Sequence, residues 1–178
     1  MSERSKKVGR GIVVQGGILA AAGLIARAIG IVRRIPLTNI IGDMGNGYYA
    51  AAYELYAIIL LLSSYSLPLA VSKMVSARVS RGQYKNAAKI FKASLMFAVL
   101  SGGIACLFVL IFADFLAGVV MGEIMSATAL RVLAPTLLIV AIMGVFRGYF
   151  QGLGTMTPTA ISQIVEQIFL VIFSLVFA

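Results

Sequence analysis

The sequence predicts an all-α polytopic transmembrane helix bundle with about five spans. Of its 178 residues, 61% are hydrophobic and 12% are charged. A soluble domain is about 45–50% apolar and about 25% charged, so this chain holds more apolar surface than a soluble core can bury. The apolar residues form long runs with basic clusters at their ends, which is the arrangement that a bilayer requires.

Five apolar runs are long enough to cross the hydrocarbon core, which takes about 20 residues. We expect spans at residues 8–31, 48–72, 90–113, 127–150 and 158–178. We expect loops at residues 36–47 and 114–123, and a turn at 151–157. The segment 75–92 is expected to extend the second and third helices, with a break at Gly82. Pro68 and Pro135 lie inside expected spans and should kink their helices.

The basic residues predict that the N-terminus lies inside the cell. One cluster precedes the first span, and a second lies between the second and third: Arg4, Lys6, Lys7 and Arg10, then Lys73, Arg78, Arg81, Lys85, Lys89 and Lys92. Such clusters mark cytoplasmic ends. Residues 168–178 end without a charged flank, so we expect a partial N-terminal lobe, cut in or just after its fifth helix.

Composition also argues against several function classes. The chain has no histidine, its one cysteine is Cys106 in an apolar run, and its six acids are scattered. No nucleophile–base pair, phosphate-binding loop or dinucleotide fingerprint can be drawn, so we expect neither an enzyme nor a metal or other cofactor. The net charge of +9 comes largely from the span flanks, so we expect membrane lipid rather than nucleic acid as the partner.

The first span combines a glycine stripe with arginines. Gly9, Gly16, Gly23 and Gly30 recur every seven residues, which predicts close packing against another helix. Arg27 and Arg34 are also seven apart, and Arg33 lies to one side. A charge at mid-span costs at least about 2.5–3.5 kcal/mol, so Arg27 is expected to face a wet cavity or a partner. Arg33 and Arg34 either do the same or snorkel to the outer headgroups.

The second span carries one acid and several tyrosines. Glu54 either pairs with Arg33 or Arg34 or serves as a proton or cation site. Tyr49, Tyr53 and Tyr56 have the i, i+4, i+7 spacing of one helix face. They form either an interfacial aromatic belt or the stacking wall of a sugar-binding cavity.

Further polar residues lie in the last two spans. Arg131, one turn before Pro135, is a candidate cavity-lining residue. Ser162 and Glu166 are four residues apart, as are Gln163 and Gln167, so one side of the fifth span should face protein or water. Glu166 is a candidate for an ion pair or for ion coupling.

Four segments resemble one known family. They are ARAIGIVRR at 26–34, PLTNIIGDMGNGYYAAAYELY at 36–56, LPLAVSKMVSARVSRGQY at 67–84 and RGYFQGLGTMTPTAISQIVEQ at 147–167. Together they resemble the polysaccharide-flippase families, in particular the stage V sporulation protein B and MurJ-like branch of the MATE-related exporter superfamily. The resemblance covers nearly the whole chain.

The resemblance implies a flippase that moves polyprenyl-pyrophosphate-linked saccharides, such as lipid II, between the leaflets of the cytoplasmic membrane. Two helical lobes would surround a cationic cavity, and this chain would need a C-terminal lobe as partner. In the MurJ-like family, first-helix arginines line the cavity, and the motif places them at Arg27 and Arg33. Helical spacing instead places Arg34 on the same helix face as Arg27. Lipid II flippases carry a second-helix arginine where residues 58–62 are apolar here, which leaves other lipid-linked glycans open.

Two rival functions remain open. A multidrug or cation antiporter of the same fold would favour acids over arginines in its cavity, and the first span has the reverse. A membrane scaffold subunit without transport would not need Arg27 within the bilayer. The flippase interpretation accounts for that arginine, because a guanidinium binds pyrophosphate in a fixed geometry.

Overall fold

The computed structural model describes residues 3–64 and 66–177, with side chains described outside 3–13, 33–38, 40–41 and 173–177. The described residues form helices and turns and contain no strand, so the predicted all-α class is confirmed. The chain divides into two units, Met1–Gly42 with Leu153–Ala178, and Asp43–Gly152. Each unit is described by itself.

The first helix, α1 (Glu3–Ser63), consists of two helical stretches that meet at Gly42. Gly42 has φ 74° and ψ 172°, a conformation that is essentially restricted to glycine. The loop expected over residues 36–47 is therefore wrong, because the backbone is helical on both sides of Gly42. Loop-forming composition is only a weak prior against a helix, and a single glycine suffices to end one stretch and begin the next.

The second predicted span is not one helix. α1 ends at Ser63, and a separate helix, α2, runs from Leu67 to Val79. Pro68 lies in the first turn of α2, where the backbone N–H that proline lacks would have no helical partner. The Leu67 amide donates to the Ser64 carbonyl at 3.2 Å within the break. Pro68 therefore begins a new helix, which corrects the expectation that it kinks a continuous one.

Two long helices follow. α3 (Tyr84–Phe115) continues into the π-helical turn η1 (Leu116–Val120), and α4 covers Ser126–Gly152. The predicted break between α2 and α3 is confirmed at Gly82, whose φ is 70°. The loop expected over residues 114–123 is shorter than predicted, because α3 and η1 extend through residue 120. α4 continues through Pro135.

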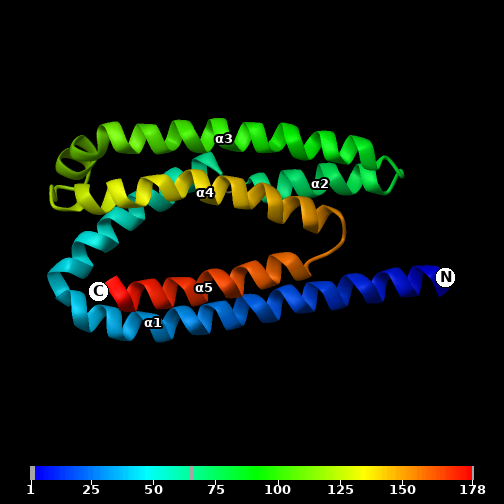
Figure 1. The fold of residues 1–178 in the computed structure, drawn as a ribbon, viewed down its shortest axis with the longest axis horizontal. Coiled ribbons are helices and arrows are strands. Elements are labelled where there is room, and N and C mark those ends of the chain that lie inside the picture. The colour runs from blue at the N-terminus through cyan, green and yellow to red at the C-terminus, as the bar shows by residue number, and fades with distance from the viewer. Residues whose placement is uncertain (1–2, 65, 178) are drawn as a thin grey trace. The chain divides into compact units, whose positions relative to one another are not determined.

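Glycines bring the helices of Asp43–Gly152 into backbone contact (Figure 1). A Cβ added to Gly102 of α3 would lie 2.9 Å from the Ala141 Cβ of α4. A Cβ added to Gly152 of α4 would lie 2.7 Å from the Val75 Cβ of α2. Contacts this short exist only because these positions have no side chain. This is the small-residue packing that holds membrane helices together.

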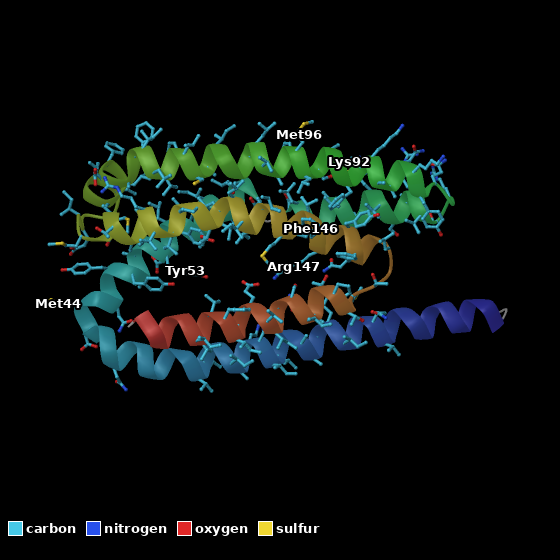
Figure 2. All side chains as sticks on the ribbon, in the orientation of Figure 1. Met44, Tyr53, Lys92, Met96, Phe146 and Arg147 are labelled. Atoms are coloured by element: carbon cyan, nitrogen blue, oxygen red, sulfur yellow. The ribbon has the colours of Figure 1, made fainter. Side chains whose placement is uncertain are left out.

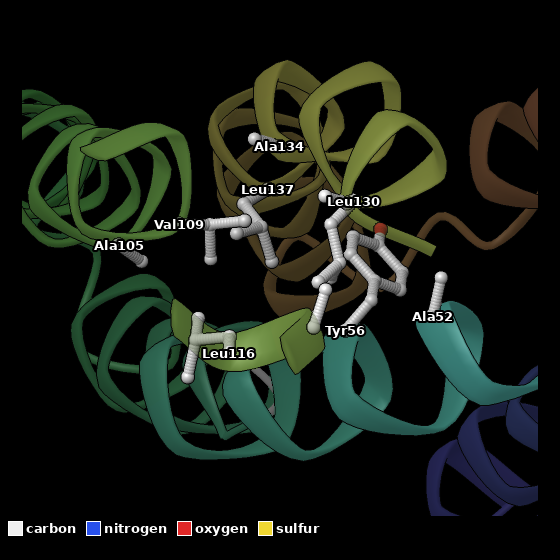
Figure 3. Packing of buried hydrophobic residues seen from close by; sticks show 10 residues of the cluster. Ala52, Tyr56, Ala105, Val109, Leu116, Leu130, Ala134 and Leu137 are labelled. Atoms are coloured by element: carbon white, nitrogen blue, oxygen red, sulfur yellow. The ribbon is translucent and has the colours of Figure 1, made fainter. Parts of the chain in front are cut away.

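The core of this unit contains mostly small and branched side chains. Figure 3 shows its buried cluster, in which Leu130 and Leu137 of α4 are fully buried. Each of three helices contributes a small alanine side chain to this cluster, which lets the helices approach closely: Ala52 of α1, Ala105 of α3 and Ala134 of α4. Tyr56 is the one aromatic residue of the buried cluster and is 7% exposed.

In the other unit, α5 (Thr157–Phe177) runs parallel to the first stretch of α1. The Met156 amide, just before α5, donates to the Gln15 side-chain oxygen at 2.9 Å. Further along, the Gln167 side-chain oxygen lies 3.5 Å from a Cβ built on Gly30. The two helices therefore run in the same direction, and α5 begins beside Gln15, with the start of α1 extending beyond it, as Figure 1 shows for this unit.

The glycine stripe of α1 makes one close approach within its own unit. A Cβ on Gly16 or on Gly23 would meet nothing within 4 Å, and only Gly30 of the described stripe approaches α5. The surroundings of Gly9 lie outside the described side chains. Within this unit the expected close packing is therefore seen only at Gly30, where the neighbour is a glutamine side chain, and at Gly16 and Gly23 it stays a prediction.

Four described helical segments are long and apolar enough to cross a membrane: Val14–Val32, Gly42–Val79, Tyr84–Val120 and Ser126–Gly152. A shorter apolar segment, Thr157–Ile172, lies in α5. The second segment contains the break between α1 and α2. These segments agree with a polytopic helix bundle.

Candidate functional site

Arg27 is the one charged residue within the apolar segment Val14–Val32 of α1. Its side chain is exposed, and it forms no ion pair with any residue in the described part of the chain. Gly30, one turn further along, is in contact with Gln167. Arg27 is thus a charge on a membrane-length apolar helix without an acidic partner among the described side chains, and its role as a cavity residue stays a prediction.

The predicted roles of Arg33 and Arg34 and the predicted pairing of Glu54 stay untested. The side chains of Arg33 and Arg34 lie outside the described residues. Glu54 is exposed on the second stretch of α1, so its predicted pairing with either arginine stays a prediction.

The polar side of α5 contains buried oxygens. The Thr159 hydroxyl and the Gln163 side-chain oxygen are buried without a described hydrogen-bond partner. Ser162 donates to the Thr159 carbonyl at 2.8 Å, and Glu166 is half-buried. Buried polar atoms are normally hydrogen-bonded, so these two oxygens are exceptions, and the expectation that this side of α5 faces protein or water stays a prediction.

The tyrosines of α1 form one continuous row. The rings of Tyr49 and Tyr53 stack at 6.0 Å between centroids, and those of Tyr53 and Tyr56 lie 5.8 Å apart. The predicted common face is therefore present. Tyr49 and Tyr53 are 42% and 50% exposed, whereas Tyr56 is buried. Figure 2 labels Tyr53 on this part of α1.

The buried end of the row is attached to α4. The hydroxyls of Tyr56 and Thr136 hydrogen-bond at 3.1 Å. Thr136 follows Pro135, whose ring frees a backbone carbonyl one turn earlier. The sequence reasoning did not single out Thr136 or Thr159. A hydroxyl beside a mid-helix proline, or four residues from a glutamine, is the signal that would have found them.

Arg131, predicted to line a cavity, forms an ion pair in this structure. Its Nη2 lies 2.6 Å from the Asp114 carboxylate at the end of α3. The two side chains are 50% and 64% exposed. The pair joins α3 and α4 at the end that carries η1, so the Arg131 charge has a partner within its own unit.

The described residues contain no group of three histidine, cysteine or acidic side chains that could hold a metal ion. The described candidate residues offer polar and electrostatic groups: the guanidiniums of Arg27 and Arg131, two separate carboxylates, a tyrosine row and an amide-rich helix face.

Comparisons with known proteins match nearly the whole chain. A profile of the family described as polysaccharide biosynthesis protein matches residues 12–178. Stage V sporulation protein B of Bacillus subtilis (strain 168) is 34% identical over 154 residues, which are 85% of this chain and 29% of that protein. Lipid II flippase MurJ of the same organism is 34% identical over 166 residues, which are 89% of this chain and 30% of that protein.

A third relative, the uncharacterized membrane protein YabM of Bacillus subtilis (strain 168), is 33% identical over 155 residues, or 84% of this chain and 27% of that protein. The chain therefore spans less than a third of the length of each of these relatives. No solved structure matches it. The long apolar helices and these relatives together identify a multi-pass bacterial membrane protein.

Proposed function

Because the chain belongs to the polysaccharide biosynthesis protein family, we propose that it forms part of the N-terminal lobe of a flippase for polyprenyl-pyrophosphate-linked saccharides. A relative whose printed name is lipid II flippase, 34% identical over 89% of this chain, supports this proposal. The match covers only 29% and 30% of the two relatives' lengths, which supports a second lobe as the partner of this chain. This assignment describes transport without chemical conversion, in keeping with the expectation of a non-enzymatic protein.

The observation that carries the proposal is Arg27. A charge within a membrane helix is unfavourable, by at least about 2.5–3.5 kcal/mol at the helix centre, so an arginine such as Arg27, with no acidic partner among the described residues, persists where an anion or a wet cavity compensates it. A pyrophosphate provides such an anion, because guanidinium and phosphate form two parallel charge-assisted hydrogen bonds. Arg27, together with Arg33 or Arg34, would hold the pyrophosphate while the saccharide crosses.

Alternating access is the proposed mechanism. In this mechanism the two lobes rock about a fixed site, which opens to one leaflet and then to the other. The N-terminus is proposed to lie inside the cell, because the clusters Arg4–Arg10 and Lys73–Lys92 then both face the cytoplasm. Glu54 and Glu166 are the proposed candidates for ion coupling, and Tyr49 and Tyr53 offer exposed ring faces to a saccharide.

The test uses the natural full-length protein in a bacterial strain depleted of its own flippase. Arg27→Ala should abolish growth support. Arg27→Lys, which keeps the charge and loses the bidentate geometry, should reduce transport about 10- to 100-fold, since a hydrogen bond to a charged group contributes about 1.5–3 kcal/mol.

Leu24→Ala is the matched control, because Leu24 is 67% exposed on the same helix and carries no charge. It should support growth like the unchanged protein. Immunoblots of membrane fractions check that all variants accumulate equally. Normal growth with Arg27→Ala at equal protein levels would show that the pyrophosphate role is wrong.

A further inference from the structure

Three lysines form a stripe along the beginning of α3. Lys85, Lys89 and Lys92 follow the i, i+4, i+7 spacing of one helix face, and all three side chains are exposed. The buried residues of α3 begin with Ala87 and Ser94, which lie on the opposite face, toward α2 and α4. We call these three residues the lysine stripe. It points away from the packed interior of its unit.

The lysine stripe continues without interruption into an apolar stripe. The next positions on the same face are Met96, Val99, Gly103, Leu107 and Leu110, and the four large side chains among them have exposed fractions of 66%, 44%, 59% and 37%. Figure 2 labels Lys92 and Met96, which lie one turn apart on α3. In a membrane protein, an exposed apolar face of this length contacts acyl chains. The lysines therefore lie on the same face as this apolar stripe and opposite the side of α3 that packs against α2 and α4 of its own unit.

The length of α3 places the lysine stripe at headgroup depth. α3 has 32 residues, or about 48 Å at about 1.5 Å per residue. The hydrocarbon core is about 30 Å thick, so about 12 residues of α3 extend beyond it. The lysines lie within the first nine residues of the helix, from Tyr84 to Lys92. Their long apolar stems can follow the helix while the ammonium groups reach the phosphate layer.

The local electrostatics at the beginning of α3 favour an external anion. The first turn of α3 contains no acidic residue, and the positive end of the helix dipole disfavours cations there. No acidic residue occurs between Glu54 and Asp114, a segment that also contains Lys73, Arg78 and Arg81. The ammonium groups of the stripe therefore have no compensating carboxylate on α2 or on the first half of α3.

We propose that the lysine stripe of α3 binds the phosphate groups of anionic phospholipids in the cytoplasmic leaflet. The occupant is a phospholipid rather than a soluble phosphate, because the apolar stripe below Lys92 takes the acyl chains of the same molecule. Each lysine near an anionic surface contributes about a fivefold gain in affinity. The proposal concerns a lipid-facing surface and does not depend on the proposed flippase activity.

The experiment titrates dioctanoyl-phosphatidylglycerol into the purified chain in detergent and measures bound lipid by native mass spectrometry. Dioctanoyl-phosphatidylcholine and inorganic phosphate are the comparison ligands. The unchanged chain should bind phosphatidylglycerol preferentially, and inorganic phosphate at equal concentration should not displace it. The triple variant Lys85→Gln, Lys89→Gln, Lys92→Gln should bind phosphatidylglycerol about 10- to 100-fold more weakly.

Two matched variants separate the stripe from charge in general. Replacing the three lysines by arginine keeps the charge and should preserve binding. Lys73→Gln with Arg78→Gln and Arg81→Gln removes the same charge from outside the stripe and should weaken binding less than about threefold. Far-UV circular dichroism checks that every variant keeps its helix content.

Equal affinity for phosphatidylglycerol and phosphatidylcholine would overturn the proposal, as would an equal loss in the two glutamine variants. If the stripe variant loses helix content, a salt titration of the unchanged chain decides instead. Phosphatidylglycerol retention should then fall steeply between 0.05 and 0.5 M NaCl, and retention that does not change with salt would contradict the proposal.

Discussion

Gly148 of α4 and Pro68 of α2 are in backbone contact: a Cβ built on Gly148 would lie 2.5 Å from the Pro68 carbonyl oxygen and 3.0 Å from its Cα. The next glycine along the helix, Gly152, makes a similar approach to the Val75 side chain. The repeated spacing of four residues, from Gly144 through Gly148 to Gly152, keeps this contact on one face of α4. α4 can therefore contact α2 along two turns.

This contact predicts a large effect of a small substitution. Gly148→Ala should lower the free energy of unfolding by about 1–3 kcal/mol, because the added methyl group meets backbone that cannot move independently. SDS titration of the protein in mixed micelles measures the change. Gly103→Ala is the control, since a Cβ at Gly103 meets nothing within 4 Å, and it should be neutral or stabilise by up to about 1 kcal/mol. Equal effects of the two substitutions would contradict the contact.

A second prediction concerns the backbone at Gly42. With its φ of 74° and ψ of 172°, any residue that carries a side chain would be strained at this position. Gly42→Ala should therefore destabilise the protein by about 1–3 kcal/mol. Gly47→Ala is the matched control, because Gly47 is helical and its Cβ would meet nothing within 4 Å. Both are measured by the same SDS titration. A neutral Gly42→Ala would show that the break between the two stretches of α1 is absent in the folded protein.

A third prediction tests the hydrogen bond between Tyr56 and Thr136. A double-mutant cycle with Tyr56→Phe and Thr136→Val should give a coupling energy of about 0.6 kcal/mol, and not above about 1.7 kcal/mol, the range of such bonds within membranes. Tyr56 has a further interaction, so Tyr56→Phe alone is expected to cost more than the coupling energy. Strictly additive single effects would show that the two hydroxyls do not interact.

The fourth prediction concerns the ion pair of Arg131 and Asp114. Both side chains are half or more exposed, so Asp114→Asn should change the free energy of unfolding by less than about 1 kcal/mol. The effect should shrink at high salt, because exposed charges are screened. The double variant Asp114→Asn with Arg131→Gln should match Asp114→Asn alone. A loss well above this limit would mean that the pair is shielded from solvent in the membrane.

Local pattern predicted the helices better than their interruptions. The apolar runs and the break at Gly82 were visible in the sequence because each is a property of neighbouring residues. The loop over residues 36–47 was wrong, and so was the kink at Pro68. In both places the residue types allow two backbone paths, and hydrogen bonds and packing select between them. A proline fits a helix start as well as a kink.

In the candidate site, too, local spacing predicted some features correctly and others not. The spacing of Tyr49, Tyr53 and Tyr56 predicted a common face, and the rings do form one row. The same reasoning predicted close packing at the α1 glycines, whereas the tight contacts lie at Gly102, Gly148 and Gly152. Glycine spacing identifies a face that permits close approach, but it cannot identify which of two such faces has a backbone opposite it.

The sequence by itself determined that this chain is an all-α membrane protein with a charge, Arg27, inside its first apolar run, because hydropathy and charge can be read along the chain. Only the tertiary structure decided that α2 is a separate helix, that α4 packs on it through glycines, and that Arg131 pairs with Asp114. The packing of α4 on α2 and the pairing of Arg131 with Asp114 depend on residues far apart in sequence, whose contacts arise only when helices fold against one another.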